Sequence, residues 1–101
     1  MSGIKIKSKR KFFESLSSVI EVLSCYNYID DTDKLAMASL AEIKKRLDVM
    51  LVTVKKEYTI TLTDAQSIAI RILYTDFIQD FKSYVGNKLH TISNQVKQKY
   101  Q

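Results

Sequence analysis

The sequence predicts an all-α protein, an up-down-up three-helix bundle with a long C-terminal helix. The chain of 101 residues contains no proline and only two glycines, whereas a fold with many tight turns needs both residue types. Apolar side chains recur every three or four residues over three long segments, which is the spacing of one helix face. About a hundred residues can bury a core of their own, so we expect one helical domain over residues 9–101.

The first helix is predicted over about residues 9–27, after a polar and basic arm at residues 1–8. Its apolar residues share one face, and the opposite face is polar. The apolar face consists of Phe12, Leu16, Val19, Leu23 and Tyr26. Ser8 is a suitable N-cap because its hydroxyl can accept a hydrogen bond from a free amide of the first turn. We therefore expect an amphipathic helix directly after the arm.

The second helix is predicted over about residues 32–57, after the turn sequence NYIDDTD. Asp31 or Thr32 is the expected N-cap, because acidic and hydroxyl side chains satisfy the free amides at a helix start. Val49 and Val52 lie outside the apolar stripe. We therefore expect this level of the helix to be buried or to contact a partner.

The segment between the second and third helices alternates apolar and polar residues. Residues 57–63 read EYTITLT, and their β-branched side chains fit a short strand. A hairpin over residues 52–62 is one interpretation, but its turn lacks the glycine or asparagine that a tight hairpin prefers. We predict an extended linker instead.

The third helix is predicted over about residues 64–100, with Thr63 and Gln66 as a capping box at its start. Its apolar residues form a ladder along one face. The ladder comprises Ile70, Tyr74, Phe77, Phe81, Val85, Leu89, Ile92, Val96 and Tyr100. Gly86 is a weak point, since glycine inside a helix costs about 1 kcal/mol relative to alanine. We expect a continuous or kinked helix, and a break at Gly86 with a folded-back end is the alternative.

The unequal lengths of the predicted helices suggest a binding surface. At 1.5 Å per residue, the second helix would be roughly 37 Å long and the third roughly 54 Å. Antiparallel packing would then leave the end of the third helix without a neighbour. An apolar stripe in water needs a cover, so we expect a second copy or a partner protein there. The candidate partner-binding residues are Val85, Leu89, Ile92, Val96 and Tyr100.

Positive charge is concentrated at one end of the predicted bundle. The formal net charge is +5, and the basic arm lies at the same end as the connection after the second helix. Such an end can neutralise phosphates, although lysine predominates over arginine and we expect no aromatic residue among the lysines. A solvated arm is the plain alternative. The candidate nucleic-acid-binding residues are Lys5, Lys7, Lys9, Arg10, Lys11, Lys55 and Lys56.

Catalysis has little support in the sequence. His90 is the single histidine and Cys25 the single cysteine, and we expect both on polar helix faces in solvent. A nucleophile needs a base within hydrogen-bond reach, and a protein metal site needs more ligands than these two residues supply. We therefore expect no enzyme activity, no metal, no cofactor and no small-molecule substrate.

The composition also bears on source and cellular setting. Lysine, isoleucine and tyrosine are plentiful while alanine and glycine are scarce, which is typical of an AT-rich genome such as that of a low-GC bacterium or a phage. One cysteine allows no disulfide framework, and the apolar runs are too short for a bilayer span. The basic N-terminus is followed by glutamates, unlike a targeting segment. We expect a cytoplasmic protein without membrane contact.

The function expected from these patterns is non-catalytic protein binding. The chain would be a small regulator or inhibitor that forms a homodimer or docks on a larger protein through the apolar face of its last helix. The alternative is a nucleic-acid-binding protein that uses the basic end. Salt separates the two, because phosphate-driven binding weakens steeply with ionic strength.

Overall fold

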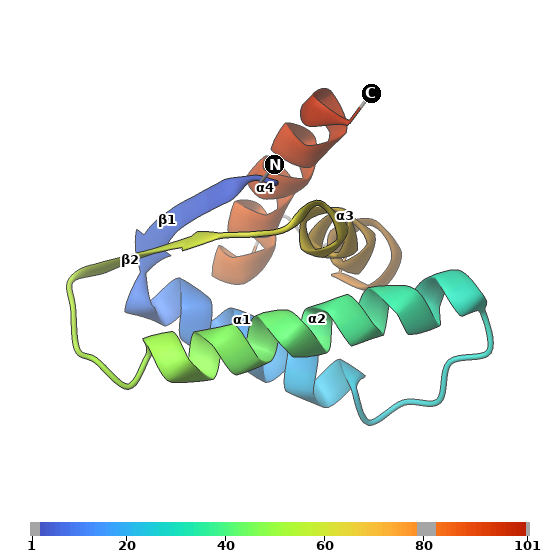
Figure 1. The fold of residues 1–101 in the computed structure, drawn as a ribbon, viewed down its shortest axis with the longest axis horizontal. Coiled ribbons are helices and arrows are strands. Elements are labelled where there is room, and N and C mark those ends of the chain that lie inside the picture. The colour runs from blue at the N-terminus through green and yellow to red at the C-terminus, as the bar shows by residue number, and fades with distance from the viewer. Residues whose placement is uncertain (1–2, 79–82, 101) are drawn as a thin grey trace.

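The computed structural model describes residues 3–78 and 83–100 of the chain (Figure 1). The described part is mostly helical, as predicted, and it adds a small two-stranded sheet. Its elements in chain order are β1 (Lys5–Lys9), α1 (Arg10–Leu23), α2 (Asp31–Met50), β2 (Glu57–Thr61), α3 (Asp64–Ile72), the π-helical segment η1 (Leu73–Ile78) and α4 (Tyr84–Lys99). This arrangement differs from the predicted three-helix bundle, because strands are present and the third predicted helix is divided.

The two strands pair antiparallel although two helices separate them in the chain. Ile6 lies opposite Ile60 in the register, and both side chains are buried. The pairing extends beyond β1. The amide of Leu62 donates a hydrogen bond to the carbonyl of Ile4 at 2.9 Å, and the amide of Gly3 donates one to the carbonyl of Leu62 at 2.7 Å. The N-terminal segment is therefore held by backbone hydrogen bonds from residue 3 onward.

The predictions about these two segments are wrong. The basic arm at residues 1–8 is a strand from residue 5 onward, and Ser8 lies in that strand while Lys9 occupies the N-cap position of α1. The extended linker over residues 57–63 is largely β2. Its partner is β1 and not residues 52–54, so the alternative hairpin is also not formed. Pairing with β1 buries one face of each strand, which a local hairpin on the surface would not.

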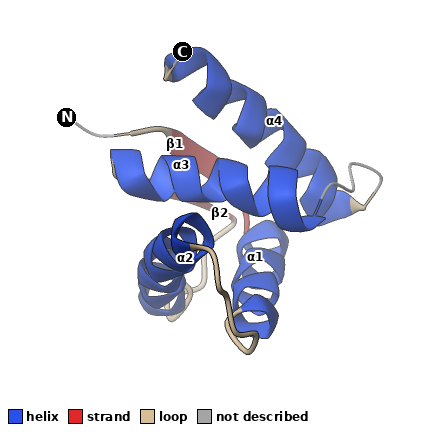
Figure 2. Ribbon diagram, turned by 90° about the vertical axis from the view of Figure 1, so that its right-hand side faces the viewer, coloured by secondary structure: helices blue, strands red, loops and turns tan. Residues whose placement is uncertain are grey.

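α1 and α2 run in opposite directions and pack against each other (Figures 1 and 2). Both are shorter than predicted, and the N-cap of α2 is Asp30, whose carboxylate accepts a hydrogen bond from the amide of Thr32 at 2.7 Å. Val49 and Val52 are 75% and 80% exposed. The prediction that their level of the second helix would be buried is therefore wrong, and contact with a partner remains a prediction.

The start of α3 is confirmed and its predicted length is wrong. Thr63 and Gln66 form the predicted capping box, but the α-helix ends at Ile72 and η1 ends at Ile78. Phe81 lies outside the described residues. α4 is a separate helix whose N-cap is Ser83, with the Ser83 hydroxyl 3.1 Å from the amide nitrogen of Gly86. The predicted long helix is thus divided before Gly86, which belongs to the first turn of α4.

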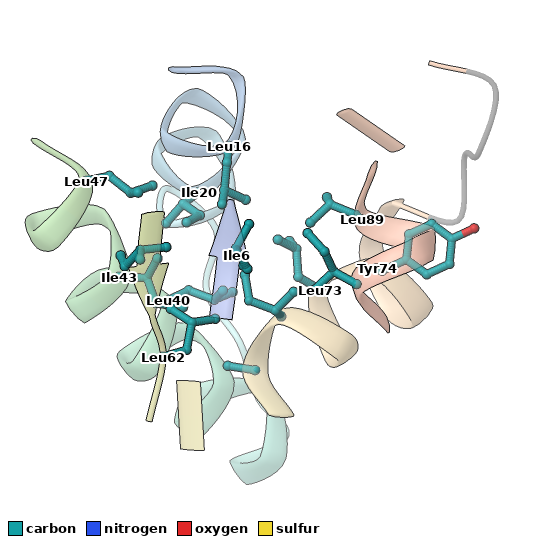
Figure 3. Close-up of a cluster of buried hydrophobic side chains, with 14 of the residues drawn as sticks. Ile6, Leu16, Ile20, Leu40, Ile43, Leu47, Leu62, Leu73, Tyr74 and Leu89 are labelled. Atoms are coloured by element: carbon teal, nitrogen blue, oxygen red, sulfur yellow. The ribbon is translucent and has the colours of Figure 1, made fainter. Parts of the chain in front are cut away.

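α4 packs back along α3, so the predicted overhang does not exist. The hydroxyl of Tyr100 at the end of α4 donates a hydrogen bond to Asp64 at the start of α3. Farther along, His90 Nδ1 lies 2.9 Å from the hydroxyl oxygen of Tyr74. An isolated helical end is marginal in water, and folding back covers its apolar stripe within the same chain. Figure 3 shows Leu89 of α4 among core side chains of the other elements.

Candidate functional site

The alternation of side chains along β1 determines which of its residues reach solvent. Successive residues of a strand point to opposite faces, so Ile6 and Ser8 are buried while the three lysines of β1 are exposed. Alternate residues of a strand lie about 7 Å apart, which spaces these lysines evenly along one face. They are Lys5, Lys7 and Lys9. Burial of the other face therefore fixes a row of positive charges at the surface.

α4 lies beside β1 and closes one side of a groove (Figure 1). The groove consists of two adjoining hollows of about 370 and 280 Å³, which share Lys7, Ser8 and Lys88. We call this surface the lysine groove. Its lysines are Lys5, Lys7, Lys9, Lys11 and Lys88. Its other polar and aromatic residues include Tyr84, Asn87, Thr91 and Gln95.

The charge of the lysine groove is only weakly offset. Glu57 is its one acidic lining residue, and a Glu57 carboxylate oxygen lies 3.9 Å from the Lys7 ammonium nitrogen. Both side chains are more than half exposed, so solvent screens this pair and its contribution is small. Among the described residues, Lys5, Lys9 and Lys88 form no ion pair. The groove therefore keeps a strongly positive potential.

An aromatic side chain lies among the lysines, contrary to prediction. The ammonium of Lys11 lies over the ring of Tyr84, 4.8 Å from the ring centroid, which is the geometry of a cation–π contact. Tyr84 is the first residue of α4 and remains 38% exposed. Lys88 follows one turn later. Sequence reasoning missed both residues because it placed the last helix far from the N-terminal segment.

Ser8 adds an unpaired polar group to the wall of the groove. The residue is 4% exposed and lines both hollows. Its hydroxyl is the one buried side-chain polar group of the described residues without a hydrogen-bond partner. Buried polar groups are nearly always paired, and an unpaired one is unfavourable. β1 therefore holds an unpaired hydroxyl on the face opposite its lysines.

Arg10 has a structural contact rather than a place in the groove lining. Its guanidinium donates to the hydroxyl of Tyr58 at 2.9 Å and to the Glu14 carboxylate at 3.3 Å. The hydrogen bond with Tyr58 raises the pKa of Arg10, and Glu14 adds to the rise. The contact joins the start of α1 to β2.

The loop that carries Lys55 and Lys56 is tied to the same tyrosine. The hydroxyl of Tyr58 accepts a hydrogen bond from the Lys55 amide at 3.0 Å and donates one to the carbonyl of Thr53 at 2.6 Å. The two lysines are exposed and line neither hollow. They lie at the predicted basic end, near the start of α1, which Tyr58 also contacts.

The five residues predicted to bind a partner are covered to different degrees by the chain itself. Leu89, Ile92 and Val96 are 0%, 6% and 1% exposed. Val85 and Tyr100 are half-buried and pack against the core. The geometric reason for expecting a partner on this stripe is therefore removed.

The residues considered for catalysis lie apart. Cys25 is exposed, with its sulfur 3.5 Å from the carbonyl oxygen of Glu21. His90 is exposed, as predicted, and its Nδ1 is hydrogen-bonded to the hydroxyl of Tyr74. In residues 3–78 and 83–100, no three side chains of histidine, cysteine, aspartate or glutamate are grouped so as to hold a metal ion. Within the same residues, no helix has the length and apolar character needed to cross a bilayer.

Comparison with known proteins gives no relative. No family model, no curated protein and no solved structure matches the chain.

Proposed function

We propose that the protein binds the phosphate backbone of a nucleic acid in the lysine groove. The observation that carries this proposal is the convergence of five lysines on one groove that a single acidic residue lines. They come from β1, the start of α1 and α4, so the fold itself gathers them. Neutralising phosphates with lysines releases condensed counterions, which drives binding.

The lining residues support binding with little sequence preference. Lysine acts as a flexible point charge, whereas arginine matches a base edge or a phosphate with a rigid fork of donors. Contacts to phosphates position a nucleic acid without reading its sequence. Asn87, Thr91 and Gln95 add polar side chains to the wall formed by α4. They suit contacts to sugars and to exposed base edges at the margin of the groove.

The unpaired hydroxyl of Ser8 is a conditional donor for an anionic ligand. A phosphate oxygen is a strong acceptor, and hydrogen bonds to ionised groups are stronger than neutral ones. Ser8 lies between Lys7 and Lys9 in the wall of both hollows. Because this hydroxyl is buried on the strand face opposite Lys7 and Lys9, a phosphate would reach it only if the wall of the groove opened.

The test is binding of a fluorescently labelled oligonucleotide of mixed sequence, followed by anisotropy over a series of salt concentrations. We expect the affinity of the wild-type protein to fall steeply with salt. Lys7→Ala with Lys88→Ala should weaken binding and lower the slope of log affinity against log salt by about 2, since each phosphate contact contributes about 0.9. The loss should be similar for different sequences.

The matched control removes the same charge elsewhere. Lys34 of α2 and Lys97 of α4 are exposed, and Lys97 lies on the side of α4 opposite Lys88 because nine residues make two and a half turns. Lys34→Ala with Lys97→Ala should keep the wild-type slope. Equal losses in the two double variants would show that net charge acts without the groove, and the proposal would then be wrong.

Non-catalytic protein binding, as by a regulator or inhibitor, is the second candidate function. It is favoured by aliphatic side chains that the fold leaves in solvent, among them Leu35 at 71%, Val52 at 80% and Val54 at 85% exposure. These residues line neither hollow of the lysine groove. Variants of the two surfaces therefore separate the two functions.

A further inference from the structure

α2 and α3 form an apolar groove on a part of the surface away from the lysine groove. It is a hollow of about 350 Å³ that is open to solvent. Its small residues are Ala36, Ala65 and Ala69, and its large apolar residues are Leu35, Ile68 and Ile72. Leu35 is 71% exposed and Ile68 is 43% exposed. We call this surface the α2–α3 groove.

Acidic residues adjoin this groove at the starts of α2 and α3, although the whole chain is basic. Asp31 and Asp33 flank Thr32, and Asp64 precedes Ala65; Thr32 and Ala65 both line the groove. A helix N-terminus carries about half a positive charge, which three carboxylates outweigh at the two helix starts together. The α2–α3 groove is therefore apolar inside and negative at its margin.

The other end of α2 has the opposite charge and the same apolar character. Val49, Val52 and Val54 are 75%, 80% and 85% exposed. Lys55 and Lys56 follow them directly and are exposed as well. We call residues 49–56 the valine loop. It presents aliphatic side chains beside positive charges, at the end of α2 opposite the α2–α3 groove (Figure 1).

The two surfaces cannot meet within one molecule. Along α2, Ser39 of the groove and Val49 of the loop are ten residues apart, which is about 15 Å of rigid helix. Each is complementary to the other in both apolar character and charge. We propose that copies of this chain associate head to tail, with the valine loop of one copy seated in the α2–α3 groove of the next.

Charge disfavours a twofold dimer that places either of these surfaces on its axis. In a twofold dimer, a patch at the axis meets its own copy. Two valine loops would bring lysines together, and two α2–α3 grooves would bring aspartates together, and such like-charge contacts are unfavourable. A head-to-tail contact pairs opposite charges and leaves one free loop and one free groove, so it continues into a chain or closes into a ring.

The inference does not depend on the proposed function. The residues of the two surfaces are not among those that line the lysine groove. A protein that failed to bind nucleic acid could still assemble, and a protein that stayed monomeric could still bind nucleic acid. In an assembly, the lysine grooves would repeat at a fixed spacing.

Light scattering on a sizing column, over a wide range of protein concentration, tests the proposal. We expect the mass of the wild-type protein to rise beyond that of a dimer as concentration increases. Leu35→Asp, which puts a charge in the groove, should keep the mass near 11.7 kDa. Val52→Asp with Val54→Asp should do the same by removing the apolar character of the loop. Val22→Asp is the control, because Val22 is 59% exposed and outside both surfaces.

Mixing the two defective proteins gives the decisive result. The Leu35→Asp protein keeps its loop and the Val52→Asp, Val54→Asp protein keeps its groove, so an equimolar mixture should form a capped dimer of twice the monomer mass. Tyrosine circular dichroism establishes that each variant is folded. A wild-type protein that stays monomeric at every concentration would overturn the proposal. So would a mass that stops at the dimer with no restoration on mixing, since that result indicates a twofold interface.

Discussion

β1 and α4 come from opposite ends of the chain, lie beside each other in the fold, and differ in how they supply core and surface. In α4 the apolar residues occupy one stripe, and the polar residues that line the lysine groove lie on a different side of the same helix. In β1 the two sets alternate residue by residue, so that Ile6 enters the core between the exposed Lys5 and Lys7. The comparison shows that core packing positions the lysines of the groove, because burying the apolar face of each element turns its lysines toward solvent.

The largest expected effect comes from the stripe of α4. Leu89→Ala should lower the free energy of unfolding by about 2–5 kcal/mol, the usual range for truncating a buried leucine. Leu89 is fully buried, whereas an overhanging helix would have left it for a partner and its truncation would scarcely change monomer stability. Urea unfolding measures the difference. The neighbouring Lys88→Ala should stay within about 0.5 kcal/mol of wild type, since Lys88 is exposed.

An unchanged unfolding midpoint for Leu89→Ala would indicate that the last helix extends beyond the rest of the protein, as the sequence predicted, and does not fold back. It would also remove the wall that α4 gives to the lysine groove. The result therefore decides whether the two chain ends lie together, as well as how the core is packed.

Local signals made much of the helical structure predictable. The capping box at Thr63 and Gln66 is confirmed. The stripe of α1 is confirmed except for Tyr26, which lies beyond the end of the helix and is 61% exposed. Both patterns involve residues within a few turns of one another. The division of the last helix before Gly86 was not predictable in this way. The sequence has no proline, and its second glycine lies inside α4. The apolar stripe is continuous in the sequence, but packing of α4 against α3 buries its second half within the same chain, and this contact is not visible in a local pattern.

The strand pair was missed because its partners are far apart in sequence. Ile4 and Ile6 alternate with Lys5 and Lys7, which is a strand pattern, but the segment is short and basic and resembles an arm. Its partner is more than fifty residues away, as the pairing of Ile6 with Ile60 shows. A strand pattern on one segment does not identify the other segment to which it pairs.

The candidate site was predictable to the extent that it lies in one segment. Lys5, Lys7, Lys9 and Lys11 were predicted as nucleic-acid-binding residues, and the structure places all four in the lysine groove. Tyr84 and Lys88 were missed, since their place depends on α4 folding back. Function as a nucleic-acid-binding surface remains a prediction for all six.

Gly3→Ala tests the N-terminal segment that leads into β1, and it should have an intermediate effect on the free energy of unfolding. A Cβ atom at this position would meet the Ser67 hydroxyl and lie 2.6 Å from the carbonyl oxygen of Thr63. Forcing an extra carbon into a packed site costs about 1–3 kcal/mol. In a free arm, the same change would be neutral or slightly stabilising. Urea unfolding of Gly3→Ala and of Lys5→Ala, an exposed strand residue, gives the measurement and its control.

A Gly3→Ala protein as stable as wild type would show that residue 3 is not held against the start of α3. The amide of Gly3 would then be free of Leu62, and its carbonyl free of the Lys99 ammonium, which lies 3.0 Å away. The strand pair would have to end at β1 itself. The groove could keep its lysines in that case, so oligonucleotide binding by the variant should be measured in parallel.

The smallest expected effect is at the end of α4, where the contact is polar. The hydrogen bond from Tyr100 to the Asp64 carboxylate raises the pKa of the Tyr100 hydroxyl above its ordinary value, and partial burial raises it further. A raised pKa in the folded state means that the stabilisation is fully present below the unfolded pKa of about 10 and is lost as the pH rises through the folded value. Tyr100→Phe should therefore be slightly less stable than wild type at neutral pH.

The difference in stability between wild type and Tyr100→Phe should stay constant from neutral pH to about pH 9 and then narrow above pH 10, because the ionised phenolate repels Asp64. Urea unfolding at each pH measures it, and ultraviolet titration of the wild-type tyrosines follows the ionisation. Asp64→Asn keeps an acceptor but removes the charge, so it should lower the pKa of Tyr100 toward its ordinary value. Equal stability of Tyr100→Phe and wild type at neutral pH would instead mean that Tyr100 stabilises α4 through its ring, which phenylalanine keeps and which packs against the core. In that case the whole length of α4, and not only Leu89 and its apolar neighbours, would be held by apolar contact, unlike β1 with its backbone hydrogen bonds.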